Sequence, residues 1–331
     1  MDSADWLDET VPSVQILEGD CLVSMASLPG KSVQTCVTSP PYFGLRDYGH
    51  DGQIGLESSP AEYVAKMVDV FREVKRVLRD DGTLWLNLGD SYAAQRGGTA
   101  MPAESLAGGV GGKGDADAKR GREQSSHAHR DARAIGLKHK DLIGIPWRVA
   151  FALQDDGWYL RQDIIWHKPN PMPESVTDRC TKAHEYLFLL SKSPKYYFDA
   201  LALKEPAVNA GKRVTLGEKS FAKGQATGKG VAPSGNGLAE FYDVPALRNR
   251  RSVWSITTKP YKGAHFATFP PDLVEPCVLA GSRAGDTVLD PFGGSGTTAQ
   301  VALQHGRSAI LCELNAEYIE LAKARIAKVK R

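Results

Sequence analysis

The sequence has few cysteines and no long apolar run. Five cysteines occur among 331 residues, scattered and without a CxxC pair, which argues against a disulfide framework and against a cysteine-based zinc site. No stretch approaches the roughly 18 apolar residues that span a bilayer. The N-terminus, MDSADWLDET, lacks the basic and then apolar pattern of a secretory signal. We therefore expect a cytoplasmic protein that carries no metal.

The net charge is also small, at +2, but positive charge is concentrated in two segments. Residues 96–140 hold nine lysines and arginines against five acidic residues, and residues 204–262 hold eleven against four. Residues 93–140 are rich in Gly, Ser, Ala and His, which is typical of a long mobile insertion. Residues 205–262 end in LRNRRSVWSITTKPYKG and are long enough for a small lobe.

The remaining sequence alternates between short apolar runs and amphipathic helical patterns. The predicted strands are Val14–Leu17, Val33–Thr38, Thr83–Leu88, Asp163–Trp166, Tyr186–Leu190, Thr287–Leu289 and Ser308–Cys312. The predicted helices are Ala61–Leu78, Ile145–Gln154, Pro271–Ala280, Thr297–Gln304 and Ala316–Lys328. Such alternation predicts an α/β domain with a mostly parallel sheet and helices on both faces. The fourth and fifth strands have no clear helix between them, so we expect that pair to be antiparallel.

A glycine-rich loop lies near the C-terminus, in VLDPFGGSGTTA at 288–299. Glycines between a strand and a helix let a ligand approach the backbone at the helix N-terminus. Glu313 ends the next strand, twenty residues after Gly293, where doubly wound folds place a carboxylate for a ribose diol. Asp290 before the loop suits a cationic amino group, as in S-adenosylmethionine. Because GSGTTA also fits GxGxxA, a nicotinamide dinucleotide remains an alternative.

A rigid motif, TSPPY at 38–42, follows the second predicted strand. Two consecutive prolines fix φ and remove backbone donors, so Ser39 and the carbonyls beside it point in set directions. Only thirty-five residues follow Gly296, enough for a helix, a strand and a last helix. The rest of the sheet must come from upstream, which indicates a circularly permuted order.

Together these motifs resemble the exocyclic-amino DNA methyltransferases, which modify cytosine N4 or adenine N6. The resemblance rests on TSPPY, on DPFGGSGTT at 290–298 and on CELN at 312–315. It is supported by FREVKRVLRDDGTLWLNLGDSY at 71–92, IIWHKPNPMP at 164–173, HEYLFLLSKS at 184–193 and HFATFPPDLV at 265–274. The order of the motifs is similar to the permuted β class. The resemblance implies a class I S-adenosylmethionine-dependent methyltransferase fold with a seven-stranded sheet.

The resemblance also implies a cofactor pocket for S-adenosyl-L-methionine. Glu313 would hold the ribose hydroxyls and Asp20 the adenine amino group, while four residues would close the pocket from the helix before the glycine loop. The full set is Asp20, His265, Phe266, Thr268, Pro270, Asp290, Phe292, Gly294, Ser295, Gly296, Thr297, Glu313, Leu314 and Asn315.

The implied reaction is direct methyl transfer to the amine of a base flipped out of duplex DNA. The Ser39 hydroxyl and the Pro40 carbonyl would accept hydrogen bonds from the amine, Pro41 would stiffen the motif, and Tyr42 would stack on the base. Serine before Pro-Pro-Tyr favours cytosine N4, and adenine N6 stays open. Cys277, although it follows a proline as in carbon-5 cytosine methyltransferases, lies in an apolar helical pattern and is interpreted as a packing residue.

Residues 1–92, 141–204 and 263–331 would form the catalytic domain, and 205–262 the target-recognition region. Its DNA-binding candidates are Lys212, Arg213, Arg248, Arg250 and Arg251. Expected partners are double-stranded DNA, a second copy in a homodimer and a cognate restriction endonuclease, with the protein on the nucleoid when it acts. Two alternatives remain, a nicotinamide-dependent oxidoreductase and a DNA-binding protein without catalysis.

Overall fold

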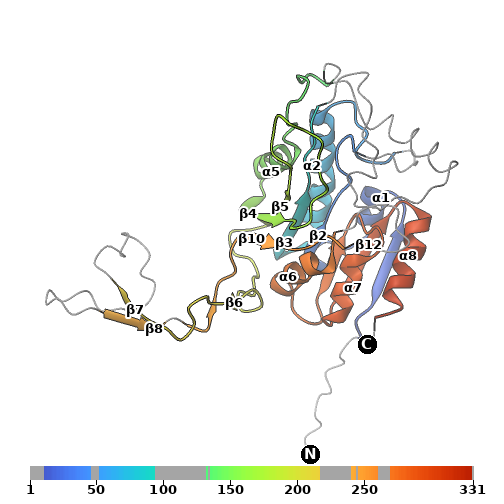
Figure 1. The fold of residues 1–331 in the computed structure, drawn as a ribbon. Helices are drawn as coiled ribbons and strands as arrows, with labels where there is room; N and C mark the ends of the chain where they lie inside the picture. Colours follow the sequence, from blue (N-terminus) through green and yellow to red (C-terminus); the bar gives the residue numbers. More distant parts are fainter. Residues whose placement is uncertain are drawn as a thin grey trace, which may run out of the picture. The chain divides into compact units, whose positions relative to one another are not determined.

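A computed structural model describes residues 11–45, 52–93, 132, 135–216, 240–243, 245–259 and 269–329. The chain divides into two compact units. The larger combines Met1–Asp199 with Ser252–Arg331, and the smaller is Ala200–Arg251. In the larger unit a twisted sheet has helices on both faces (Figure 1), which confirms the predicted α/β class. No helix among the described residues is both long and apolar enough to cross a membrane.

The larger unit is built on one sheet in the order β1-β12-β11-β2-β3-β5-β4-β10. Only β5 runs antiparallel to its neighbours, which confirms the pairing expected for the fourth and fifth predicted strands. The strands are β1 (Val14–Glu18), β2 (Val33–Thr38), β3 (Leu78–Leu88), β4 (Tyr159–His167), β5 (His184–Ser191), β10 (Val253–Ser255), β11 (Thr287–Asp290) and β12 (Ser308–Glu313).

The expected count of seven strands is wrong, because β10 adds an eighth at the edge of the sheet. It pairs in parallel with β4, Trp254 opposite Trp166. Three residues are too short to show an alternating pattern, so no sequence signal marked this strand.

The permuted order is visible in the pairing of the two ends of the sequence. Strand β1 lies beside β12, and β2 lies beside β11, all in parallel. The cofactor half of the sheet is thus completed by the last strands of the chain.

Six described helices cover the two faces of this sheet. Helices α1, α2 and α5 pack with one another on one face, and α6, α7 and α8 lie together on the other. The six-residue α1 carries no periodic pattern and was not predicted. The helices are α1 (Cys21–Ala26), α2 (Pro60–Val77), α5 (Ile145–Asp155), α6 (Pro271–Gly281), α7 (Thr297–Gln304) and α8 (Ala316–Ile326).

Helix α2 shows how the sequence dictates a helix and its buried face. The Ser59 side chain accepts a hydrogen bond from the Glu62 amide, and Pro60 occupies the first turn, where its missing N–H costs nothing. Buried side chains then recur every three or four residues, at Tyr63, Met67, Val70, Phe71, Val74 and Val77. Each such burial contributes about 1.5–3 kcal/mol, so this face holds α2 against the sheet.

The smaller unit contains two short antiparallel pairs. Strand β6 (Glu205–Pro206) pairs with β9 (Leu247–Arg248), and β7 (Arg213–Leu216) pairs with β8 (Glu240–Asp243). The unit ends before the predicted limit of 262, because the described residues from Ser252 onward belong to the larger unit.

Most of the predicted insertion, residues 94–131, lies outside the described residues. Near the C-terminal end of the predicted insertion, Ala132 and Ile135 are buried in the same core cluster as α2 and α5. These residues therefore belong to the packed core and not to a mobile loop. The Lys140 amide also donates to the Ala93 carbonyl at 3.0 Å.

Candidate active site

The predicted cofactor and catalytic motifs meet at the carboxyl ends of β11 and β2. The chain leaves these two neighbouring strands toward opposite sides of the sheet, which is where open α/β sheets form ligand crevices. Thr38 at the end of β2 donates its hydroxyl hydrogen bond to Asp290 Oδ1 at the end of β11, at 2.7 Å. Two motifs 252 residues apart are thereby joined directly.

Asp290 is fully buried and its two carboxylate oxygens are occupied within the protein. Thr38 and the Phe292 amide donate to Oδ1, and the Thr298 hydroxyl donates to Oδ2 at 2.7 Å. Burial raises the pKa of Asp290 to about 6, although the three hydrogen bonds oppose that rise. The described contacts make Asp290 a link between β2, the glycine loop and α7. Its contact with the cofactor stays a prediction.

The glycine loop is held in place by Glu313 at the end of β12. Glu313 Oε2 accepts from the Gly294 amide at 2.7 Å, and Oε1 accepts from the Asn315 amide at 2.9 Å. Asn315 in turn caps α8 by accepting from the Glu317 amide. The carboxylate predicted to hold a ribose therefore already lies against the loop that precedes α7.

The loop residues fit a nucleoside-bearing ligand such as S-adenosylmethionine. The Ser295 hydroxyl is buried and, within the described part of the chain, has no hydrogen-bond partner, so a polar ligand atom would complete it. Gly296 has φ +79°, and a Cβ there would lie 2.9 Å from Ala322 Cβ. A side chain at this position would collide with α8, so glycine lets the start of α7 pack closely against that helix.

The other predicted cofactor residues differ in what surrounds them. Asp20 caps α1, accepting from the Leu22 and Val23 amides at 2.9 and 3.2 Å. Phe292 packs on the core cluster, Leu314 is half-buried and Thr297 is buried.

Of the four residues predicted to close the pocket from the helix before the glycine loop, Pro270 alone lies within the described ranges. Helix α6 begins at Pro271, and Pro270 is its N-cap, outside the helix. His265, Phe266 and Thr268 lie outside the described residues.

The catalytic loop is organised by hydrogen bonds to β3 and β5. The Ser39 hydroxyl donates to Asn87 Oδ1 at 3.2 Å, and the Tyr42 hydroxyl donates to Glu185 Oε2 at 2.7 Å. Asn87 Nδ2 donates to the same carboxylate oxygen at 3.2 Å and to the Tyr186 carbonyl at 3.1 Å. Because Ser39 gives its hydrogen to Asn87, its oxygen lone pairs remain available to accept from an amine.

The Tyr42 ring is held against backbone. A Cβ on Gly89 would lie 2.5 Å from Tyr42 Cε2, so the ring lies directly on the chain after β3. Tyr63 of α2 donates its hydroxyl to the Pro41 carbonyl at 2.8 Å. Prolines, a bare glycine and a buried helix residue together fix the loop that carries Ser39.

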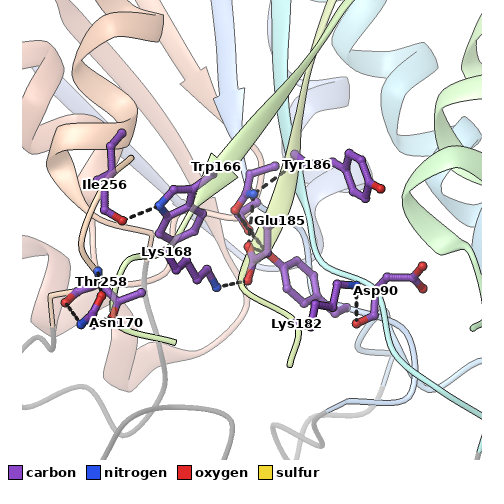
Figure 2. A network of polar contacts seen from close by, with 12 residues as sticks. Asp90, Trp166, Lys168, Asn170, Lys182, Glu185, Tyr186, Ile256 and Thr258 are labelled. Atoms are coloured by element: carbon purple, nitrogen blue, oxygen red, sulfur yellow. Dashed lines mark hydrogen bonds and ion pairs between the residues drawn. The ribbon is translucent and has the colours of Figure 1, made fainter. Parts of the chain in front are cut away.

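Glu185 is also paired with Lys168, which follows β4 (Figure 2). Burial alone would raise the pKa of Glu185, but the Lys168 charge and hydrogen bonds from Lys168, Tyr42 and Asn87 outweigh it and lower that pKa. Burial and the Glu185 charge raise the pKa of Tyr42 well above its ordinary value. At neutral pH the site therefore contains a charged carboxylate and a neutral phenol.

Sequence reasoning gave no role to Asn87, Glu185 or Lys168. All three stand at strand ends inside quoted motifs, namely LNLGDSY, HEYLF and WHKPN. Polar residues at the carboxyl-end edge of the sheet were the available signal.

The DNA-binding candidates of the smaller unit are partly engaged with acidic neighbours. Arg248 and Arg251 both pair with Glu205, with nitrogen–oxygen distances of 2.9 and 3.0 Å. Lys212 is exposed, Arg250 is half-buried, and Arg213 belongs to β7. Their contacts with DNA stay predictions.

A nucleophilic role for Cys277 has no support in the described geometry. Cys277 is fully buried in α6 and donates to the Leu273 carbonyl, which confirms it as a packing residue. No group of three or more His, Cys, Asp or Glu side chains that could hold a metal ion occurs in the described ranges.

Comparison with known proteins agrees with this geometry. Residues 33–324 match a family described as DNA methylase, of the N6/N4 type. The chain is 47% identical over 311 residues to the Type II methyltransferase M.Cfr9I of Citrobacter freundii, covering 94% of this chain and 87% of that protein. It is 46% identical over 326 residues to M.SmaI of Serratia marcescens, covering 98% and 94%.

Solved structures share the fold at lower identity. The PvuII DNA methyltransferase (cytosine-N4-specific) has a TM-score of 0.61 at 19% identity, covering 96% of this chain and 87% of that one. A putative DNA modification methylase from Thermus thermophilus, complexed with S-adenosyl-L-methionine, has a TM-score of 0.54 at 24% identity, covering 96% and 95%. The chain therefore belongs to the exocyclic-amino DNA methyltransferases, which transfer the methyl group of S-adenosylmethionine to amino groups of DNA bases.

Proposed function

We propose that this chain methylates the N4 amine of cytosine in duplex DNA, as the modification enzyme of a restriction-modification pair. The observation that carries the proposal is the Ser39 hydroxyl, which donates to Asn87 and so presents an acceptor oxygen at the end of β2. A neutral serine before Pro-Pro-Tyr favours cytosine in this family. The Type II methyltransferases at 46–47% identity support the modification role, with a cognate endonuclease as partner.

Activation of the amine is the first task of the site. An exocyclic amine is a poor nucleophile because its lone pair is delocalised into the ring. Hydrogen bonds from its two N–H groups to the Ser39 oxygen and the Pro40 carbonyl pull the nitrogen toward tetrahedral geometry. S-adenosylmethionine supplies the electrophilic methyl group. The contribution of the protein is positioning and electrostatics in a site that excludes water.

Holding the extruded base is the second task. The target amine inside a duplex is out of reach, so the base is flipped into the pocket. Tyr42, fixed by Gly89 and by its bond to Glu185, offers a flat face for stacking, worth about 1–3 kcal/mol. After transfer the nitrogen carries an extra proton, which Ser39 and Pro40 hold by hydrogen bonds until the methylated base leaves the site and solvent takes the proton.

Recognition of the DNA site is assigned to the basic smaller unit, with phosphate and base contacts from Lys212, Arg213, Arg248, Arg250 and Arg251. A homodimer would place two such units on a palindromic site. Substituting Lys212 alone is expected to weaken DNA binding and reduce its dependence on salt, because one phosphate contact is lost.

The test is expression in a host without DNA methylation, followed by modification-sensitive sequencing of the host DNA. We expect N4-methylcytosine at one short motif, and far less of it in cells expressing the Ser39→Ala variant at the same level. N6-methyladenine at a motif would overturn the assignment of the base. Unmodified DNA from cells containing folded wild-type protein would overturn the enzymatic proposal.

A further inference from the structure

An ion pair lies next to the catalytic loop, in the motifs WHKPN and HEYLF, which take no part in the chemical steps proposed above. Lys168 and Glu185 contact each other (Figure 2), and their side chains are only 21% and 16% exposed. The antiparallel register of β4 and β5 places His167 opposite His184, and the Lys168 amide donates to the Ala183 carbonyl at 2.8 Å. The hairpin itself therefore sets the two charges side by side.

The two oxygens of Glu185 have separate partners. Oε1 faces the Lys168 ammonium, whereas Oε2 accepts from both the Tyr42 hydroxyl at 2.7 Å and Asn87 Nδ2 at 3.2 Å. This bond and a second one from Nδ2 to the Tyr186 carbonyl orient Asn87 so that its Oδ1 accepts from Ser39. A single carboxylate oxygen thus orients the stacking residue directly and the acceptor hydroxyl through one intermediate.

The Lys168 ammonium is fixed by the edge of the sheet. It lies 4.4 Å from the centre of the Trp166 ring, and Trp166 Nε1 donates to the Ile256 carbonyl at 2.9 Å. Asn170 and Thr258 exchange hydrogen bonds at 3.1 and 3.2 Å (Figure 2). Strand β10 and the residues after it therefore anchor the segment that carries Lys168.

We propose that Glu185, held by Lys168, is the positioning residue that orients Tyr42 and, through Asn87, Ser39 for methyl transfer. Glu185 touches neither base nor cofactor in this role. Burying an ion pair costs desolvation energy that apolar packing would avoid. The hydrogen bonds that Glu185 Oε2 accepts offset part of this cost and orient their donors. The proposal rests on the proposed functions of Ser39 and Tyr42.

A double-mutant cycle tests whether Glu185 acts through Tyr42. Glu185→Gln, Tyr42→Phe and the double variant are compared in single-turnover transfer of labelled methyl to unmethylated genomic DNA. Each single variant is expected to be about 10- to 100-fold slower, the range for loss of a hydrogen bond to a charged group. The double variant is expected to be no slower than the slower single variant, because both substitutions act on the same charge-assisted bond between Tyr42 and Glu185. S-adenosylmethionine affinity is expected to be unchanged in all three.

The pH dependence of the methyl-transfer rate distinguishes a positioning role of Glu185 from a role in stability alone. The charged or titratable groups around Glu185 are Lys168, Lys182, His184 and Tyr42. In Lys168→Met the ammonium is lost, and burial then raises the pKa of Glu185. The transfer rate of this variant should fall as the pH is lowered, more steeply than the wild-type rate, and adding Glu185→Gln should remove that extra pH dependence.

The matched control is Asp286→Asn. Asp286 is another largely buried carboxylate, 10% exposed and paired with Arg79, at the opposite end of β11. Its substitution is expected to leave the transfer rate unchanged. If Glu185→Gln does not fold, the same cycle is run with Lys168→Met and Tyr42→Phe.

The outcomes separate this inference from the proposed function. A wild-type rate in Glu185→Gln, or effects that multiply in the cycle, would overturn the positioning role. Wild-type rates in both Ser39→Ala and Tyr42→Ala would instead overturn the proposed mechanism itself.

Discussion

The two loops that meet at the carboxyl ends of β11 and β2 are built in opposite ways. The glycine loop is shaped by missing side chains, with Gly296 at positive φ and pressed on Ala322. The TSPPY loop is shaped by side chains, with Tyr42 held by Glu185 and Pro41 held by Tyr63. A bare backbone suits ligand binding, while a fixed set of acceptors suits catalysis. Changes in the first loop should therefore appear in affinity, and changes in the second in rate.

Removing the Ser39 hydroxyl should have the largest effect and is the sharpest test of this difference. Ser39→Ala is expected to slow single-turnover methyl transfer by about 100- to 1000-fold, the range for losing one preorganised polar group in an active site. The dissociation constant for S-adenosylmethionine, measured by calorimetric titration, should not change. Equal loss of rate and cofactor affinity would break the distinction between the loops.

Asp290, which joins the loops, should make stability depend on pH. Its folded pKa of about 6 lies above its ordinary value of 3.8, so the folded state binds more protons between these values. The free energy of unfolding therefore decreases by at most about 3 kcal/mol as pH rises from about 4 to 6. Above pH 6 this contribution no longer changes with pH. Asp290→Asn should lose this component when urea unfolding is followed from pH 4 to 7. An identical pH dependence in the variant would contradict the shifted pKa.

Gly296→Ala should affect the cofactor loop alone. The added Cβ would lie 2.9 Å from Ala322 Cβ at a residue with φ +79°, a combined cost of about 2 kcal/mol. We expect roughly tenfold weaker S-adenosylmethionine binding, with the rate restored at saturating cofactor. Gly285→Ala is the control, since Gly285 has φ +85° but no atom within 4 Å of the added Cβ. If both variants lost S-adenosylmethionine affinity equally, the effect would come from backbone strain and not from the contact with Ala322.

Gly89→Ala should give the smallest effect, on rate. A methyl group 2.5 Å from Tyr42 Cε2 forces the ring to shift, and we expect about a tenfold slower transfer. Cofactor affinity should be unchanged. Gly30→Ala, whose Cβ would make only an ordinary 3.6 Å contact, should behave as wild type. A Gly89→Ala enzyme of normal rate would show that the ring position is not critical.

Long periodic elements and dense motifs were predictable from the sequence, whereas short elements were not. Helix α2 has a cap and six regularly spaced buried side chains after Pro60, so its limits differ from the prediction by one residue at each end. Strand β10 and helix α1 are too short for any period, and their formation depends on pairing with β4 and packing against α2.

The protein contacts of Asp290 were not predictable from the sequence, because a carboxylate before a glycine loop has no visible partner there. Its predicted contact with the cofactor stays a prediction. Its partners Thr38 and Thr298 come from β2 and α7 and are recognisable only once β2 and β11 are neighbours. The Lys168–Glu185 pair depends likewise on the register of β4 and β5, which the residues between them do not encode in any readable pattern.

The pairing of β2 with β11 has a consequence for how the protein is made. One neighbour of β2, strand β3, follows within about forty residues, whereas β11 is synthesised some 250 residues later. Until then one edge of a strand that is entirely buried in the folded protein has no partner on the growing chain, a state prone to aggregation. Closing so long a loop is also intrinsically slow. The segment from β11 onward completes the sheet and the cofactor loop together, and it does so only after most of the sheet has been synthesised.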